Sequence, residues 1–554
     1  MSGKITGISG PVVTTDMQGL KLNEKVSVGC GKLTGEAIRI EKAQAVIQVY
    51  EDTRGVGLHE PVTATGMPLH VRLGPGMLSE MYDGLQRPLE RLLAEQGPFL
   101  IAGKEVDVLD YSRTWKHVPL KSEGDTLLQG EFFGYVEEGS FRHYLAYHTS
   151  SQSSRGDGKR LSKRRIASIK EGAFTLGEPL GTLDDGTEFF AWHDWPVRIP
   201  KPFKKKATSN EPLITGQRSI DLMFPIARGG TAVMPGGFGT GKTVLEQSIA
   251  KYADVDIVIY VGCGERGNEM ADLIEEFRVL SDPWASKPLM ERTVLVVNTS
   301  NMPVAAREAS IYTAVTIAEY YRDMGFHVLL LADSLSRWAE AMREISASLE
   351  EMPGEEGYPT YLSSRLAGFF ERAGVVETIS GRNGSLTMIL SVSPAGADFT
   401  EPVTQACLRA TGASLILDTS LAYSRHYPAI NWNQSYSLYT TELSEYFKEK
   451  VAEQWPALQI RCREILQKEE SLKEVIEIIG VSGLQDDDRL LITIAEKIRT
   501  ELLSQNAFSD DAFSPPEKTF SIMERIIRFY DMAESRLKNG EPLEDVLKEG
   551  GITV

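Results

Sequence analysis

The chain has 554 residues, a length that predicts three to four domains. Hydrophobic residues make up 42% and charged residues 25%, values typical of a globular protein, so the composition excludes a disordered or collagen-like chain. No apolar run approaches the roughly 20 residues that a membrane-spanning helix needs. The net charge of −18 disfavours nucleic acid as a partner over most of the surface.

The cysteines and the first residues predict the compartment. The four cysteines lie far apart and form no Cys-x-x-Cys pair, which disfavours a zinc site and fits a reducing environment. The opening sequence, MSGKITGISGPVV, lacks the apolar core of a signal peptide. We therefore expect a cytoplasmic protein. If it works at a membrane, other chains would have to attach it there.

Three segments precede the predicted α/β domain. Residues 1–72 are predicted to form a small β-barrel or sandwich, because short runs rich in β-branched residues alternate with Gly, Asn and Asp turns. Residues 73–110 contain a predicted helix, Leu78–Glu95, and are assigned to the start of the next domain. Residues 111–190 are rich in Gly, Ser, His and aromatic residues and contain short strand-like runs, which predicts a β-rich segment.

A basic segment at residues 150–165 contains six Lys or Arg residues. Such a run is typical of a nucleic-acid or targeting segment, or simply of a solvated loop. No aromatic residues interleave the charges to stack on bases, so we interpret the segment as a solvated loop.

Residues 191–440 are predicted to form an α/β domain with a parallel sheet, because apolar strands alternate with helical stretches. The predicted strands are Thr231–Met234, Asp256–Val261, Thr293–Asn298, His327–Ala332 and Leu386–Val392. The predicted helices are Thr243–Tyr252, Asn268–Phe277 and Val304–Met324. Residues 441–554 are helical in pattern with charged faces, which predicts a C-terminal helical domain.

Residues 236–243 read GGFGTGKT and match the pattern G-x-x-x-x-G-K-[ST] of a phosphate-binding loop. Backbone N–H groups of such a loop and the following helix N-terminus surround a phosphate. Lys242 would reach the β- and γ-phosphates of a nucleotide, and the Thr243 hydroxyl would bind Mg²⁺. The candidate nucleotide-binding residues of this segment are Gly236, Gly237, Phe238, Gly239, Thr240, Gly241, Lys242, Thr243 and Val244.

Asp333 ends the apolar run His327–Ala332, 90 residues after Thr243. An Asp at that place can cap a strand or helix. Together with a phosphate loop it is typical of a carboxylate that supports Mg²⁺ through water.

The sequence GCGERG at residues 262–267 matches the dinucleotide-binding pattern G-x-G-x-x-G. We reject that interpretation, because the motif follows a complete phosphate loop and places Glu265 where a pyrophosphate would approach. Glu265 itself, 23 residues after Lys242 and at the carboxyl end of an apolar strand, can polarise a water for attack on a γ-phosphate. Arg266 can hold phosphate oxygens or contact a neighbouring chain, and an ordinary salt bridge is the alternative.

With these residues in place, the chain resembles the catalytic A subunit of the V-type and archaeal-type rotary ATPases over nearly its whole length. The resemblance rests on GGFGTGKT, VGCGERGNEMADLIEEF, ADSLSRWAEAMREIS, RHYPAINW and QNAF, together with PLITGQRSIDLMFPIARGG before the loop. It implies an N-terminal β-barrel, a central RecA-like α/β P-loop domain with a β-rich insertion at residues 111–190 that projects outward, and a C-terminal α-helical domain. One departure is Thr240, where eukaryotic members usually carry Cys.

The resemblance also implies the site residues and their ligands. ATP or ADP and Mg²⁺ would be bound by Lys242 and Thr243, with Asp333 supporting the metal through water. Glu265 would activate water, and Arg266 would contact the γ-phosphate. An adenine pocket would include Tyr427, Ala507 and Phe508.

The partners implied by the resemblance belong to a membrane-bound rotary complex. Three copies would alternate with three non-catalytic B-type subunits, each of which supplies an arginine in trans to the site. A central rotor shaft would face the loop Glu350–Pro359, and peripheral stalk subunits would meet the insertion. The chain would lie on the cytoplasmic face of the membrane, and ATP hydrolysis or synthesis would be coupled to H⁺ or Na⁺ movement in a membrane sector made of other chains.

Two alternatives are open at this point. A hexameric helicase or secretion ATPase has the same core, but a helicase needs a basic channel or a stacking platform that this acidic sequence does not indicate. A non-catalytic nucleotide-binding subunit would lack the loop lysine or the carboxylate, whereas Lys242, Thr243 and Glu265 are all present.

Overall fold

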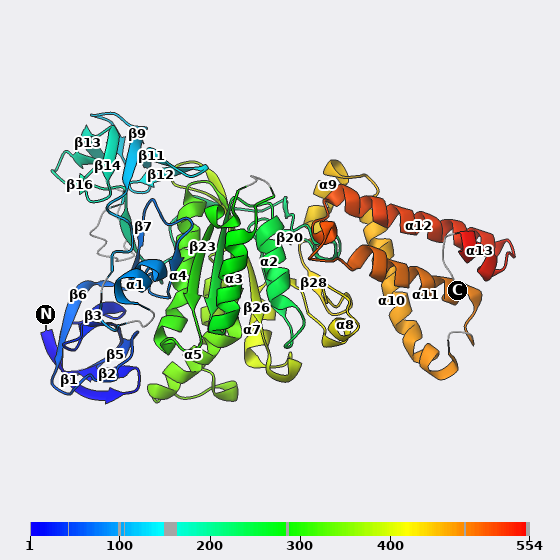
Figure 1. Cartoon of the computed structure of the whole chain (residues 1–554), viewed down its shortest axis with the longest axis horizontal. Helices are drawn as coiled ribbons and strands as arrows, with labels where there is room; N and C mark the ends of the chain where they lie inside the picture. Colours follow the sequence, from blue (N-terminus) through cyan, green and yellow to red (C-terminus); the bar gives the residue numbers. More distant parts are fainter. Residues whose placement is uncertain are drawn as a thin grey trace. The chain divides into compact units, whose positions relative to one another are not determined.

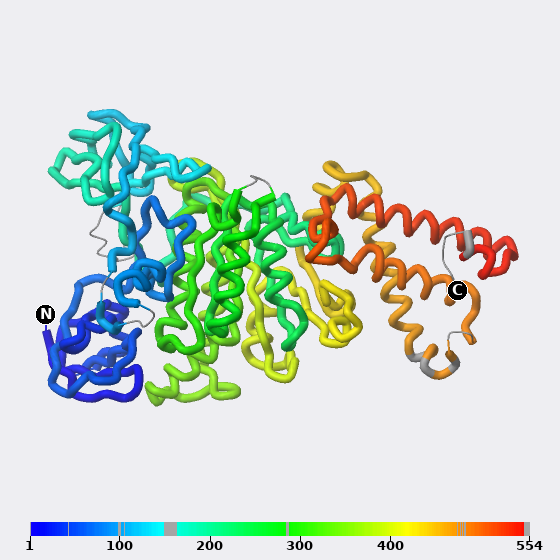
Figure 2. Tube along the Cα trace, in the orientation of Figure 1, coloured from blue at the N-terminus to red at the C-terminus, as the bar shows by residue number. Residues whose placement is uncertain are grey.

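The computed structural model describes residues 2–41, 44–97, 101–104, 106–148, 163–283, 287–480 and 483–549 (Figures 1 and 2). The chain forms two compact units. The first contains Met1–Thr208, Val255–Leu390 and Thr400–Cys407, and the second contains Ser209–Asp254, Ser391–Phe399 and Leu408–Val554. Residues 150–162 of the basic segment lie outside the described residues, so its interpretation as a loop stays a prediction.

The first unit begins with a closed antiparallel barrel, which confirms the predicted N-terminal β-domain (Figure 1, blue). Its strands are β1 (Ser2–Ser9), β2 (Val12–Thr15), β3 (Glu24–Val28), β4 (Leu33–Ile40), β5 (Ala45–Val49) and β6 (Pro61–Pro68), in the order β1-β2-β5-β4-β3-β6. Alternate residues such as Val26, Val28 and Ile47 fill the interior. Closure pairs every strand on both sides, which removes exposed sheet edges.

The predicted helix Leu78–Glu95 is wrong in its first half. The structure has a short strand, β8 (Met81–Tyr82), and then the helix α1 (Leu89–Gln96). The backbone carbonyl of Asp83 accepts a hydrogen bond from the N–H of Gln86 at 3.0 Å, and its side chain accepts one from the N–H of Arg87 at 2.8 Å. This turn and the proline at position 88 end any helical run, so α1 begins only after them.

The insertion consists of two small antiparallel sheets. One contains β12 (Phe141–Ala146), β11 (Phe132–Glu138), β9 (Thr114–Pro119) and β14 (Gly172–Thr175). The other contains β10 (Thr126–Leu127), β13 (Arg164–Ile169), β15 (Gly181–Leu183) and β16 (Glu188–Phe189). Buried aromatic residues, including Phe133, Phe174 and Phe189, form their common core.

The main sheet of the first unit contains five neighbouring parallel strands. They lie in the order β26 (Asn383–Val392), β24 (His327–Asp333), β22 (Ile257–Cys263), β23 (Thr293–Asn298) and β8. The helices α3 (Gly267–Val279), α4 (Val304–Asp323) and α5 (Leu335–Ser348) connect or follow them (Figure 1, green). All seven residues of β22 are buried, as expected for a parallel strand in the middle of a sheet. The predicted alternation of strands and helices is therefore confirmed.

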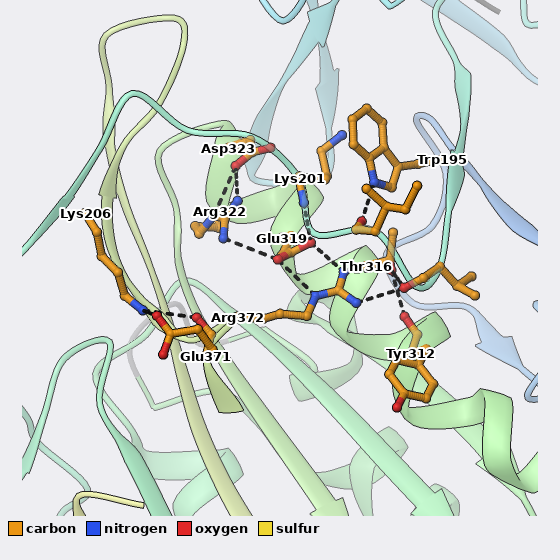
Figure 3. Close-up of polar contacts among 12 residues, drawn as sticks. Trp195, Lys201, Lys206, Tyr312, Thr316, Glu319, Arg322, Asp323, Glu371 and Arg372 are labelled. Carbon is orange, nitrogen blue, oxygen red and sulfur yellow. Dashed lines mark hydrogen bonds and ion pairs between the residues drawn. The ribbon is translucent and has the colours of Figure 1, made fainter. Parts of the chain in front are cut away.

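The C-terminal half of α4 contributes Glu319, Arg322 and Asp323 to an ion cluster that also contains Lys201 and Arg372 (Figure 3). All of these residues except the half-buried Asp323 are buried. The Glu319 carboxylate accepts from Arg372 Nη2 at 2.6 Å and from the Lys201 backbone N–H at 3.0 Å. Arg322 pairs with Asp323 at 2.7 Å. The cluster holds three basic and two acidic side chains, so one positive charge is in excess when Lys201 is protonated.

Lys201 is the member of this cluster that titrates near neutral pH. Burial lowers its pKa to about 8, against the opposing attraction of Asp323 and Glu319. Its Nζ lies 3.1 Å from Nε2 of His193, whose own pKa burial holds well below the ordinary value. The folded protein therefore binds fewer protons at Lys201 than the unfolded chain does between about pH 8 and 10.4.

We expect Lys201→Met to change how stability depends on pH. Because the folded-state pKa of Lys201 is lowered, the wild type should gain stability relative to the variant as pH rises from 7 to 10, by up to about 3 kcal/mol. Thermal unfolding midpoints of both proteins across this range measure the difference. A difference that stays constant with pH would show that Lys201 is not titrating in the folded protein.

The second unit combines a small part of the α/β domain with the C-terminal helices. β21 (Thr231–Pro235) pairs in parallel with β27 (Ala413–Ser414), and α2 (Lys242–Tyr252) follows β21 after the phosphate loop. The C-terminal helices are α9 (Thr440–Lys450), α10 (Trp455–Ile479), α11 (Asp486–Lys497), α12 (Pro516–Lys538) and α13 (Leu543–Glu549). This confirms the predicted helical domain. Among the described helices, none has the length and apolar character needed to cross a membrane.

Candidate active site

The phosphate loop is a tight turn between β21 and α2. Gly239 and Gly241 adopt positive φ angles of 78° and 82°, which side chains disfavour, and α2 begins directly after Gly241. The Thr240 hydroxyl donates to the Gly237 carbonyl at 2.9 Å and braces the turn. The helix-type hydrogen bonds of α2 begin with the Leu245 N–H, which donates to the Gly241 carbonyl at 3.0 Å, and the positive end of the helix dipole at this start suits an anion.

Lys242 folds back over this loop. Its Nζ donates to the carbonyl oxygens of Gly236 at 2.6 Å and Gly237 at 2.8 Å. The ammonium group is therefore held over the loop, and Thr243 follows it in the first turn of α2. Both residues occupy the positions that the sequence pattern predicts for a phosphate-binding lysine and a hydroxyl ligand.

A pocket of about 510 Å³ lies beside the loop within the same unit. Two aromatic side chains line it, Tyr427 at 41% exposure and Phe508 at 87%. The remaining lining residues are Gln217, Thr240, Gly241, Val244, Leu245, Ser248, Leu417, Arg425, Pro428, Ala429, Ser504, Gln505, Asn506 and Ala507. An exposed aromatic face beside a phosphate loop suits a flat ring system. The structure thus brings together Thr240, Val244, Tyr427, Ala507 and Phe508.

In the other unit, two carboxylates lie at the carboxyl ends of neighbouring parallel strands. Asp333 is the last residue of β24 and pairs in register with Gly262 of β22, and Glu265 follows the end of β22 by two residues. The Glu265 carbonyl accepts from the Ser300 N–H at 2.9 Å, which fixes the turn after the strand. Carboxyl ends of parallel strands are where ligands bind in open α/β sheets.

The electrostatics of this edge favour a cation. Burial and the negative charges of Asp333 and Glu269 together raise the pKa of Glu265 to about 7, whereas Arg337 and a hydrogen bond with Ser334 act in the opposite direction. Arg337, on α5, also pairs with Glu340 at 2.9 Å. The sequence interpretation assigned no role to Arg337. Its only signal was its place within ADSLSRW, four residues after Asp333.

Arg266 lies on the surface at the start of α3. Its side chain is 67% exposed and reaches Glu269 at 3.8 Å, an i,i+3 pair of the kind that contributes little to stability. The salt bridge named as the alternative is therefore present. A contact with phosphate stays a prediction.

Two of the three glycines of GCGERG have a packing reason. A Cβ on Gly262 would come within 2.1 Å of the Met270 sulfur, and one on Gly264 within 2.6 Å of Cβ of Arg337. Close approach of α3 and α5 to the end of β22 therefore requires small residues here. Packing therefore accounts for Gly262 and Gly264, whereas a Cβ on Gly267 would meet nothing within 4 Å.

A phosphate loop at a helix start, an aromatic pocket beside it and paired carboxylates at the ends of parallel strands together define a P-loop nucleotide-binding protein. Comparisons with known proteins narrow this class. The nucleotide-binding domain model of the ATP synthase alpha/beta family matches residues 216–437, and that family's beta-barrel domain matches residues 5–66. Its barrel-sandwich domain matches residues 106–198, and the C-terminal domain of V and A type ATP synthase matches residues 444–547.

The full chain is similar to the A subunit of the A-type ATP synthase of Methanosarcina acetivorans, with 49% identity over 99% of this chain and 93% of the relative. It is 47% identical to the corresponding A subunit of Methanopyrus kandleri, over 99% of this chain and 92% of the relative. The chain therefore belongs to the A subunits of A-type ATP synthases, the catalytic subunits of V/A-type ATPases that couple ATP hydrolysis or synthesis to ion translocation.

A solved structure of the ATPase EscN from the type III secretion system of enteropathogenic E. coli has the same fold. The TM-score is 0.68, covering 95% of this chain and all of that one, at 21% identity. At this identity the likeness concerns the fold alone, so it does not favour the secretion-ATPase alternative.

Proposed function

We propose that this chain binds Mg-ATP between its phosphate loop and its aromatic pocket, and that Glu265 activates the attacking water. The observation that carries the proposal is the 510 Å³ pocket, which joins Thr240, Gly241 and Val244 to the exposed rings of Tyr427 and Phe508. A phosphate cradle and a flat aromatic surface in one pocket match the two ends of a nucleotide.

The phosphates would lie on the backbone N–H groups of residues 236–243, with Lys242 turning from the loop carbonyls toward the β- and γ-phosphates. The adenine ring would stack on Tyr427 and Phe508, with Ala507 and Val244 providing apolar contact. An ammonium group and a helix N-terminus act together on the same anion, so binding should depend strongly on both.

The side-chain chemistry of Thr243 and of Asp333 suits Mg²⁺. The Thr243 hydroxyl and the Asp333 carboxylate are hard oxygen ligands, and Asp333 is only 5% exposed beside a second carboxylate whose pKa it raises. A divalent cation would offset that repulsion. We propose that Thr243 holds the metal directly and Asp333 holds it through water. When bound, Mg²⁺ neutralises negative charge on the nucleotide phosphates.

Glu265 and Arg266 would act on the terminal phosphate. The Glu265 carboxylate would accept a proton from water and orient that water for in-line attack. Arg266, which is exposed, would exchange its weak pair with Glu269 for the oxygens of the γ-phosphate. The same groups would serve synthesis in the reverse direction.

The identity of the subunits around this chain is also part of the proposal. We propose that the site lies at an interface with a non-catalytic B-type subunit that supplies an arginine, with a central shaft, peripheral stalk subunits and a membrane sector for H⁺ or Na⁺ completing the assembly. The chain would sit on the cytoplasmic face of the membrane. The family, whose members belong to multi-subunit ATPases, supports this arrangement.

Mg-ATP hydrolysis by the purified chain alone and by the complex isolated from its own membranes tests the proposal. We expect little turnover by the chain alone and strong turnover in the complex, because a partner arginine would complete the site. Equal turnover in both preparations would show a self-sufficient ATPase and would remove the partner arginine from the mechanism. No turnover in either preparation would contradict the assignment of the site itself.

A further inference from the structure

Arg218 is a buried cation in the second unit. Its side chain is 2% exposed, and the residue lies just before the short π-helix η1 (Ser219–Met223). Its guanidinium forms a two-pronged pair with Asp511, with Nη1–Oδ1 at 2.6 Å and Nη2–Oδ2 at 2.7 Å. Its Nε donates to the carbonyl of Leu502 at 2.7 Å, and Nη2 also donates to that of Ser504 at 2.6 Å. All of these partners lie close to 290 residues further along the chain.

These partners flank one segment, residues 504–511, which we call the base loop. It carries Ala507 and the 87% exposed ring of Phe508. Within the described range 483–549, no helix or strand spans residues 504–509, between the π-helix η6 (Ile498–Leu503) and the 3₁₀ turn η7 (Asp510–Ala512). The hydrogen bonds within the loop join near neighbours only: the Asn506 side chain accepts from the Phe508 N–H at 2.9 Å, and the Asn506 backbone carbonyl accepts from the Ser509 hydroxyl at 3.3 Å. The Ser509 hydroxyl in turn accepts from the Asp511 N–H at 3.2 Å. The position of the base loop therefore depends on side chains from outside the loop.

Gln505 links the base loop to the rest of the pocket. Its Oε1 accepts from the backbone N–H of Arg218 at 2.8 Å, and its Nε2 donates to the Gly216 carbonyl at 2.8 Å. Its own N–H donates to the carbonyl of Tyr427 at 2.7 Å. Gln505 thus connects the base loop both to residues 216–218 and to Tyr427, the other aromatic residue of the pocket.

We propose that Arg218 is a positioning residue for the nucleotide base. Its two-pronged pair with Asp511 and its bonds to the carbonyls of Leu502 and Ser504 hold Phe508 opposite Tyr427 at the spacing of a purine ring. The inference rests on the proposed function, because it assumes that the base enters this pocket. Arg218 does not touch the nucleotide. It acts through Ser504, Gln505 and Asp511 on the aromatic ring that does.

The chemistry of Arg218 suits this role better than that of a lysine. A planar guanidinium can satisfy two carboxylate oxygens and two carbonyls at fixed angles, whereas an ammonium is a single point charge. The hydrogen bond from Arg218, with help from Lys518 at 3.0 Å, lowers the pKa of Asp511, so the pair is ionised at neutral pH. Asp511 is 35% exposed, so it can be changed without opening a buried cavity.

The test compares four variants in the assembled complex: Arg218→Lys, Asp511→Asn, Phe508→Ala and Arg528→Lys. The last is the matched control, since Arg528 pairs with Glu524 on the exposed face of α12 at 74% exposure. For each we would measure kcat, KM for ATP, and the inhibition constants of Mg-ADP and of Mg-pyrophosphate, which lacks a base. Asp511→Asn keeps the result interpretable if Arg218→Lys folds poorly.

We expect Arg218→Lys and Asp511→Asn to raise KM for ATP and the inhibition constant of ADP about tenfold, with kcat and the pyrophosphate constant changed about twofold or less. A purely structural role would weaken ADP and pyrophosphate alike, or lower kcat and stability without a selective loss of base binding, and would overturn the inference. If Phe508→Ala selectively weakens ADP binding and neither Arg218→Lys nor Asp511→Asn does, the result supports the base pocket but contradicts the positioning role of Arg218. If Phe508→Ala has no selective effect either, the proposed base pocket itself is wrong.

Discussion

Replacing Glu265 with glutamine should abolish most turnover and leave nucleotide binding nearly intact. Glutamine keeps the size of the side chain but cannot accept a proton from water, whereas the phosphate loop is unchanged. We expect hydrolysis by the assembled complex to fall by about 10² to 10⁴-fold. Steady-state hydrolysis and equilibrium Mg-ATP binding, measured on one preparation, separate the two effects.

The matched control for this substitution is Glu275→Gln, on the exposed face of α3, where the side chain is 73% exposed and pairs with Arg278. It makes the same chemical change ten residues further on and should keep wild-type turnover. Turnover near the wild-type level in Glu265→Gln would show that another group activates the water. Loss of both binding and turnover would indicate that Glu265 supports the bound nucleotide and not only the chemistry.

Replacing Lys242 with alanine should weaken binding as well as turnover. The ammonium group lies over the loop carbonyls of Gly236 and Gly237, where it can turn to the phosphates, and alanine removes the one side-chain cation that the loop itself carries. Loss of a charged hydrogen-bond donor to a phosphate costs about 2 to 3 kcal/mol, which corresponds to a loss of affinity on the order of 30 to 150-fold. Titration of the variant with Mg-ATP measures this loss directly.

Lys251→Ala provides the control on the same helix, because Lys251 lies in the last turn of α2, away from its N-terminus. Thermal unfolding of both variants shows whether lost loop contacts, and not lost phosphate contacts, account for the effect. Unchanged nucleotide affinity in Lys242→Ala would exclude this loop as the phosphate site. Affinity lost together with a large fall in the unfolding midpoint would leave Lys242 with a role in shaping the loop.

The phosphate loop could be predicted because it is local. Eight consecutive residues contain the glycines that permit the turn, the lysine and the hydroxyl, and the apolar strand before them and the helix after them are equally readable. The barrel strands and the parallel strands follow from their own residues in the same way. The predicted helix Leu78–Glu95 failed for two reasons. Pro88 is a local signal against a helix through it, whereas the pairing of β8 with β23, a strand more than 200 residues later, is a tertiary contact that no local pattern records.

The pocket beside the loop is a product of tertiary structure. Tyr427 and Phe508 are 81 residues apart, and an exposed phenylalanine in a polar loop has no periodicity that would single it out, so only the family resemblance indicated both. The only signal for Arg218 was its place within PLITGQRSIDLMFPIARGG, and nothing indicated its pairing with Asp511, because ion pairs between distant segments leave no trace in either segment's pattern. The sequence by itself determined the phosphate loop, the candidate general base Glu265 and the order of domains, because each of these follows from residues that are close together in the chain. Tertiary structure decided which distant side chains hold the base loop and which charges are buried together around Lys201, since burial and pairing depend on what the folded chain places beside each group.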